Sequence, residues 1–62
     1  MANVSPIDLQ KALKGANYPA SRSDLVECAK SNGADSGLVQ QLSGLGEDRF
    51  DGPNEVEKSF FG

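Results

Sequence analysis

Apolar residues recur at the spacing of an α-helix in several separate stretches of the chain. Within residues 9–16 they lie three or four positions apart, which places them on one face of a helix. Ser5 and Pro6 precede this stretch, and Asp8 follows Ser5 by three positions. A serine N-cap followed by proline and an acidic residue is typical of a helix start. The pattern predicts a first helix that ends near Gly15.

The same start signal occurs again at Ser21, with Asp24 three residues later. A second helix is expected to follow it and to end at Asn32–Gly33, because glycine favours the conformation that closes a helix. Its buried face is predicted to hold Leu25, Cys28 and Ala29, with Val26 beside them. A third helix is expected to begin after Asp35 as its cap and to bury an apolar set: Leu38, Val39, Leu42 and Leu45.

The last third of the chain predicts a loop and one further helix. Residues 47–50 are expected to place Phe50 in the core, and Pro53 lies where a final short helix begins. The alternation of polar and apolar residues that marks a strand is absent. The sequence therefore predicts an all-α fold, a compact single domain over residues 1–62. It has three to four short helices, with a helix-turn-helix-like central pair.

Composition restricts how this domain is stabilised and where it works. A chain of 62 residues has a marginal core, and Cys28 as the single cysteine excludes an intramolecular disulfide. With no histidine, a structural zinc site lacks its ligands, and no cofactor is expected. The lone thiol and the lack of a secretory or membrane-spanning apolar run predict a cytoplasmic protein. Self-association would help to stabilise so small a core.

The order of these signals resembles a bacterial family of small domains, domain of unknown function 2795 (DUF2795). The resemblance is carried by Leu9 and Leu13, the turn at residues 18–21, the break at 32–35 and the segment 50–56. Gly46 stands where a proline is expected, and Gly52 where a capping serine is common. The resemblance implies the helix boundaries, and it implies no catalytic residues.

The central pair raises the hypothesis of a DNA reader. Ala29, Gly33, Val39 and Leu42 have the spacing of a helix-turn-helix. Its second helix has no lysine or arginine, although specific DNA binding draws much of its affinity from phosphate neutralisation. This alternative, a nucleic-acid-binding regulator, is therefore disfavoured. Its contacts would come from two glutamines and the basic residues of the first half: Lys11, Lys14, Arg22, Lys30, Gln40 and Gln41.

Charge and the other chemical groups add little support for binding nucleic acid or for catalysis. Residues 1–31 carry four basic and three acidic residues, whereas residues 32–62 carry two basic and six acidic ones. The acidic group around Asp48 does not have the register of a calcium loop, and Cys28 has no evident cause for a reactive thiolate. Without histidine the serines lack a general base, so the chain is not expected to be an enzyme.

The C-terminal sequence Ser-Phe-Phe-Gly favours an interaction surface. One helix face cannot easily bury two adjacent phenylalanines, so Phe61 is expected to be partly exposed. The alternative is that both rings cover Phe50 and Tyr18 as an aromatic cluster. The sequence thus predicts a non-catalytic module that binds an unknown protein or itself, and predicts no membrane contact. The candidate contact residues are Val56, Glu57, Lys58 and Phe61.

Overall fold

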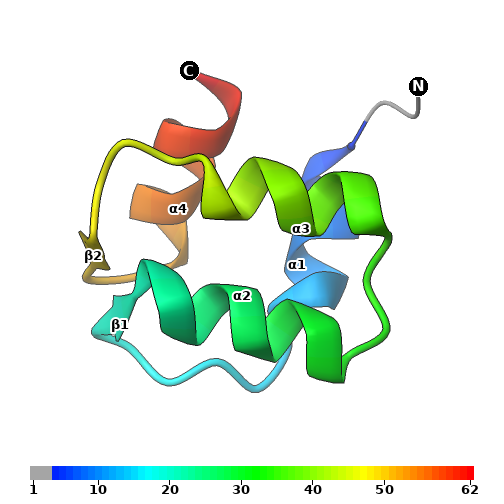
Figure 1. Cartoon of the computed structure of the whole chain (residues 1–62). Coiled ribbons are helices and arrows are strands. Elements are labelled where there is room, and N and C mark those ends of the chain that lie inside the picture. Colours follow the sequence, from blue (N-terminus) through cyan, green and yellow to red (C-terminus); the bar gives the residue numbers. More distant parts are fainter. Residues whose placement is uncertain (1–3) are drawn as a thin grey trace.

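The computed structural model describes residues 4–62, which form four α-helices and one pair of very short strands (Figure 1). The predicted all-α domain of three to four short helices is confirmed as a small, mostly helical domain with four helices. In chain order the elements are α1 (Pro6–Ala12), β1 (Ala20–Ser21), α2 (Arg22–Ser31), α3 (Ser36–Ser43), β2 (Arg49–Phe50) and α4 (Pro53–Phe61).

The first two helices begin at the serines that the sequence indicated. In α1 the Asp8 amide donates to Ser5 Oγ at 3.2 Å, and the Ser5 amide donates to the Asp8 carboxylate at 3.2 Å. Ser21 and Asp24 form the same reciprocal pair at the start of α2, at 3.0 and 3.2 Å. Each pair satisfies two amides that lack partners inside the helix.

The other helix ends differ in how well their backbone groups are satisfied. Gly33, with φ of +74°, follows the last turn of α2 as predicted. Helix α1 ends at Ala12, and Gly15, with φ of +88°, lies in the turn beyond it. Asp35 occupies the N-cap position of α3, but its side chain accepts no hydrogen bond from the helix. Gly52 precedes α4 and offers no side-chain cap.

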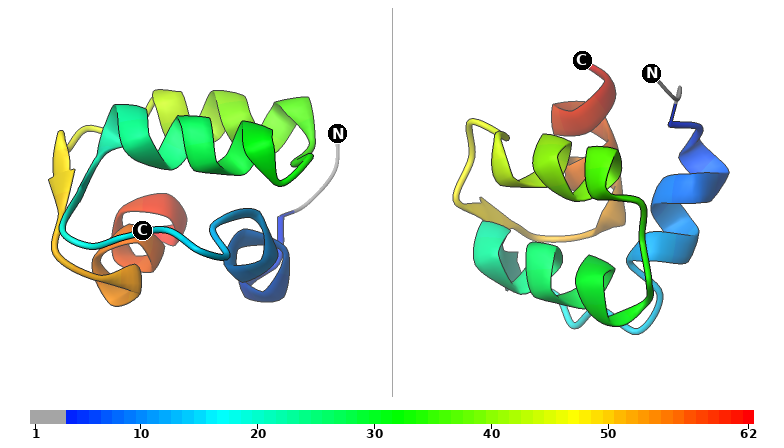
Figure 2. Two further views of the ribbon diagram at one scale, coloured as in Figure 1. Left: turned by 90° about the horizontal axis from the view of Figure 1, so that it is seen from below. Right: turned by 45° about the vertical axis from the view of Figure 1, so that its right-hand side comes forward.

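The helices form two layers with the core between them (Figure 2). One layer holds α2 and α3, which lie side by side and run in opposite directions (Figure 1). The other layer holds α1 and α4, which also run in opposite directions. Leucines at helical spacing, an aromatic ring and small residues fill the space between: Leu9, Ala12, Leu13, Ala20, Leu25, Ala29, Leu38, Leu42, Leu45, Phe50 and Val56.

The strand pair is an addition to the predicted fold. Strands β1 and β2 are antiparallel, with Ala20 opposite Phe50 and Ser21 opposite Arg49. The Arg22 amide donates to the Asp48 carbonyl at 3.0 Å, next to the ladder. Two-residue strands are too short to show an alternating pattern in the sequence. Their pairing holds Phe50 in the core, where its side chain is fully buried.

Candidate interaction surface

The positions of the C-terminal aromatic residues agree in part with the sequence prediction. Val56 and Phe60 share one face of α4, and Phe60 packs against the core. Phe61 lies next to Phe60 on the helix and is 45% exposed, and their ring centroids are 4.9 Å apart in an edge-to-face arrangement. The expected exposure of Phe61 is confirmed.

The prediction that Val56 contacts a partner is wrong. Val56 is 0% exposed, because the face of α4 that carries it packs against α1 and β2. Its neighbours in the predicted contact set are accessible to different degrees: Glu57 is half-buried and Lys58 is exposed. Of the four residues named for contact, three therefore remain on the surface.

Ile7 is an exposed apolar residue that sequence reasoning missed. Its side chain is 63% exposed, and it joins Phe61 as the second exposed large hydrophobic residue in the described chain. The position of Ile7 on α1 relative to the buried residues of that helix could have indicated its exposure. Ile7 precedes the buried Leu9 by two positions, a rotation of about 200° around the helix axis. It therefore faces away from the core.

A shallow groove of about 170 Å³ runs between α1 and α4. Ile7 lies three residues before Gln10 of the groove, and Phe61 lies four residues after Glu57 of the groove. Residues at these spacings are neighbours on one helix surface. The first turn of α1 and the last turn of α4 lie at the same end of the molecule (Figure 2). We call Ile7, Phe61 and the groove lining the α1–α4 surface; the lining residues are Leu9, Gln10, Leu13, Tyr18, Pro53 and Glu57.

Tyr18 lines the groove together with Leu13 and Pro53. Burial of its half-buried ring raises the pKa of the phenol above 10.0, and the negative charge of an ionised Cys28 nearby raises it further. Both causes disfavour the phenolate in the folded protein. The hydroxyl therefore stays protonated across the physiological range.

Titration of Tyr18 is expected to show a midpoint above pH 10.0, because its pKa is raised in the folded state. The folded protein binds the phenolic proton more tightly than the unfolded chain. The associated stability is fully present below pH 10.0 and is lost as the pH rises through the folded-state pKa. Absorbance near 295 nm reports this residue alone, since the chain has one tyrosine and no tryptophan. A midpoint at or below that of the denatured chain would contradict the burial of the phenol.

The basic residues named for nucleic-acid contact do not form one stripe. Arg22 begins α2 and Lys30 lies near its end, eight residues or roughly 12 Å farther along. Lys11 lines an open cleft between α1 and α3 together with the carboxylates of Asp8 and Asp35. Lys14 lies after the end of α1 and is exposed.

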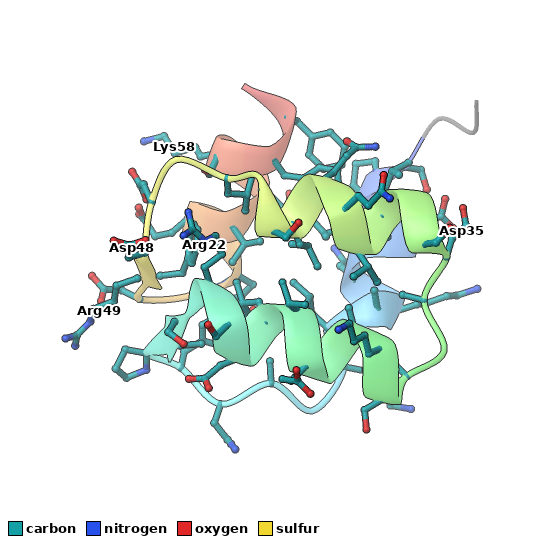
Figure 3. All side chains as sticks on the ribbon, viewed as in Figure 1. Arg22, Asp35, Asp48, Arg49 and Lys58 are labelled. Carbon is teal, nitrogen blue, oxygen red and sulfur yellow. The ribbon has the colours of Figure 1, made fainter. Side chains whose placement is uncertain are left out.

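Arg22 is engaged within the fold. Its Nη1 donates to the Leu45 carbonyl, and its Nη2 lies 3.3 Å from Asp48 Oδ1. The side chains of Arg22 and Asp48 lie together beside β2 (Figure 3). The guanidinium therefore joins the start of α2 to the chain that follows α3. The prediction that Arg22 serves as a free phosphate contact does not fit this arrangement.

Helix α3 presents Gln40 and Gln41, and both are exposed. They line an open cleft together with Val4 and the N-terminal residues of α3. The helix runs beside α2 in the opposite direction (Figure 1). The second helix of a DNA-reading helix-turn-helix instead crosses the first at about 90–120°. The central pair is thus a helical hairpin with a glycine turn.

The end of α2 is joined to the end of α1 by one amide side chain. Asn32 Nδ2 donates to the carbonyls of Ala12 at 2.7 Å and Lys14 at 3.0 Å. Cys28 is half-buried beside it, with Sγ 3.6 Å from the Lys14 carbonyl. Cys28 thus lies at the edge of the buried face on which the sequence placed it.

Residues 4–62 lack both a metal-binding cluster and a helix that could span a membrane. They contain no group of three or more His, Cys, Asp or Glu side chains that could hold a metal ion. None of the helices in this part of the chain combines the length and the apolar character needed to cross a membrane.

The fold and the α1–α4 surface define a small, mostly helical, two-layer domain with an exposed apolar edge. The model of the family described as protein of unknown function (DUF2795) matches residues 4–57, so the chain belongs to that family. The match includes Ile7 and the whole groove, and Phe61 lies four residues beyond it. Comparisons with curated proteins and with solved structures gave no match.

Proposed function

We propose that this domain is a non-catalytic binding module that holds another protein chain against the α1–α4 surface. The observation that carries the proposal is the position of Ile7 and Phe61. These two exposed apolar side chains belong to the first turn of α1 and the last turn of α4, which lie at the same end of the two helices that line the groove (Figure 2). Large apolar side chains that gather beside an apolar groove mark interaction sites on small soluble domains.

The surface has the composition of a protein contact. Ile7 and Phe61 supply apolar area at one end, while Leu13 and Pro53 line the groove between the helices. Full burial of an isoleucine or phenylalanine side chain contributes about 1.5–3 kcal/mol, so these half-exposed side chains contribute roughly half of that each. Gln10 and Glu57 provide a polar rim, with Lys58 beyond it. An apolar centre with a polar rim is the usual anatomy of such contacts.

The chemistry of the groove supports binding rather than catalysis. Its titratable groups are the Glu57 carboxylate and the Tyr18 phenol. A general acid or base works best with a pKa near the operating pH, and burial moves the pKa of Tyr18 away from neutrality. The groove is also smaller than the 300–1,000 Å³ that small-molecule sites usually occupy.

Affinity capture tests the proposal. The tagged domain is incubated, with and without nuclease, in lysate of the organism that encodes it. The double variant Ile7→Ser/Phe61→Ser is run beside the matched control Gln40→Ser/Gln41→Ser, which changes two exposed residues of the other layer. We expect a protein that is captured despite nuclease, retained by the glutamine variant and lost, at least tenfold, with the Ile7/Phe61 variant.

Other outcomes of the capture would contradict the proposal. If the Ile7/Phe61 variant captures the same protein equally well, the α1–α4 surface is not the contact. If capture disappears with nuclease or with the glutamine variant, the nucleic-acid alternative through α3 is favoured instead. Circular dichroism of each variant establishes that it is folded before the comparison is made.

A further inference from the structure

We propose that Asn32 is a site of spontaneous modification, at which opening of the C-terminal end of α2 converts the side-chain amide into a carboxylate. Asn32 is followed by Gly33, and both residues are exposed to water. Because glycine has no Cβ, its amide nitrogen is the least hindered backbone nucleophile that can follow an asparagine. The inference goes beyond the proposed contact and does not depend on the α1–α4 surface.

The reaction needs only the chain and water. The Gly33 nitrogen loses its proton to solvent and attacks Cγ of Asn32. A bond forms between these two atoms, the Cγ–Nδ2 bond breaks, and the side-chain nitrogen takes up a proton and leaves as ammonia. Water then adds to either carbonyl of the resulting succinimide ring and opens it. One opening gives aspartate, and the other gives isoaspartate, whose main chain runs through the side-chain carbon.

The native geometry holds the reacting atoms apart. Asn32 has a ψ of 3°, so its own amide nitrogen eclipses the Gly33 nitrogen. Ring closure instead requires Cβ of Asn32 to eclipse that nitrogen, because both atoms belong to the five-membered ring. The nucleophile is also engaged, since the Gly33 amide donates to the Lys30 carbonyl at 3.0 Å. The reaction therefore requires local opening at the end of α2.

The side chain of Asn32 is held by the fold as well. Its Nδ2 donates to the Ala12 carbonyl at 2.7 Å and to the Lys14 carbonyl at 3.0 Å. These two hydrogen bonds oppose rotation of Cγ toward Gly33. The opening that allows the reaction therefore also separates α2 from the end of α1.

Modification removes this connection between the two helices. A carboxylate only accepts hydrogen bonds, so its charge would face the carbonyl oxygens of Ala12 and Lys14 without a donor. Asn32 is also the C-cap of α2, where the helix dipole disfavours negative charge. Isoaspartate adds an extra main-chain atom to the turn in which the Ala34 amide donates to the Ala29 carbonyl at 2.9 Å. Both products thus favour the opened state, and a transient opening becomes a permanent change.

Peptide mapping of the aged full-length chain tests the site. Trypsin places Asn32, Asn17 and Asn54 on three separate peptides, and the last two precede residues larger than glycine and are internal controls. The chain is kept at mildly alkaline pH in native buffer and in urea, and mass spectrometry measures the modified fraction of each peptide. In urea we expect Asn32 to react about tenfold faster, or more, than either control and than Asn32 in the native chain. Equal rates in either comparison overturn the proposal.

Chemical denaturation of Asn32→Asp tests the effect on the fold. We expect its folding equilibrium constant to be about tenfold lower, or less, because two hydrogen bonds are lost and a charge is placed at the helix end. The matched control Asn17→Asp makes the same change at another exposed residue and is expected to alter the constant by less than about threefold.

A second variant covers the case in which Asn32→Asp is too unstable for a complete denaturation curve. Asn32→Ser shortens the side chain without adding charge, and we expect it to lower the folding equilibrium constant about fivefold. Equal stability of Asn32→Asp and Asn17→Asp, or of Asn32→Ser and the wild type, overturns the link between modification and the packing of α1 on α2.

Discussion

Phe50→Ala is expected to remove a large part of the free energy of unfolding at 25 °C. The side chain of Phe50 is fully buried, and removal of a buried phenylalanine ring costs about 3–5 kcal/mol. A domain of 62 residues has a total stability of roughly 3–9 kcal/mol. The loss is thus comparable with the whole free energy of unfolding. Chemical denaturation followed by circular dichroism measures the change.

Phe61→Ala is the matched control, since it removes the same ring from a side chain that is 45% exposed. We expect it to lower the free energy of unfolding by less than about 1 kcal/mol. Phe50→Leu refills part of the space and is expected to fall between the two. Equal effects of Phe50→Ala and Phe61→Ala would mean that β2 does not hold the Phe50 ring in the core.

Arg22→Met is expected to lower the free energy of unfolding by about 1.5–3 kcal/mol. The change keeps a long apolar side chain and removes the charged donor to the Leu45 carbonyl. A hydrogen bond with a charged partner contributes about that amount, and this carbonyl belongs to a buried residue. Urea denaturation at constant pH measures the difference.

Asp48→Asn separates the two interactions of Arg22. Asp48 is exposed, with a side-chain exposure of 88%, and exposed ion pairs contribute about 0–1 kcal/mol. We expect this variant to be far less destabilised than Arg22→Met. Lys30→Met removes a basic residue at the other end of α2 and is expected to have no measurable effect. A loss with Asp48→Asn as large as that with Arg22→Met would assign the stabilisation to the ion pair.

The helix starts could be predicted from the sequence because their chemistry is local. The reciprocal pairs Ser5–Asp8 and Ser21–Asp24 join residues three positions apart, so no knowledge of the rest of the fold is needed to recognise them. The stop at Gly33 is also local, since only its own positive φ matters. The apolar faces followed from the helical period alone.

The features that the sequence did not show depend on contacts between distant segments. The strand pair joins Ala20 to Phe50, and Arg22 at the start of α2 reaches Leu45 in the chain that follows α3. Neither contact leaves a periodic trace. A lone basic residue on a helix is equally typical of a solvated surface and of an internal hydrogen bond, so the role of Arg22 required the structure.

The candidate surface was only partly predictable for a related reason. Adjacent phenylalanines at the end of α4 predicted that one ring is exposed, because two neighbours cannot share one face. Which other residue joins Phe61 depends on how α4 packs against α1. The packing buries Val56 and brings the last turn of α4 beside the first turn of α1, where Ile7 is exposed.

The two-layer arrangement has a consequence for the order in which the chain folds. Helices α2 and α3 follow each other directly, so their hairpin forms from neighbouring segments, and this hairpin brings the ends of β1 and β2 close together. Helices α1 and α4 come from opposite ends of the described chain, and contacts between distant segments carry the largest loop-closure entropy. We therefore expect the α1–α4 surface to assemble last. In that order of folding, only a chain that has completed its folding presents the proposed contact surface.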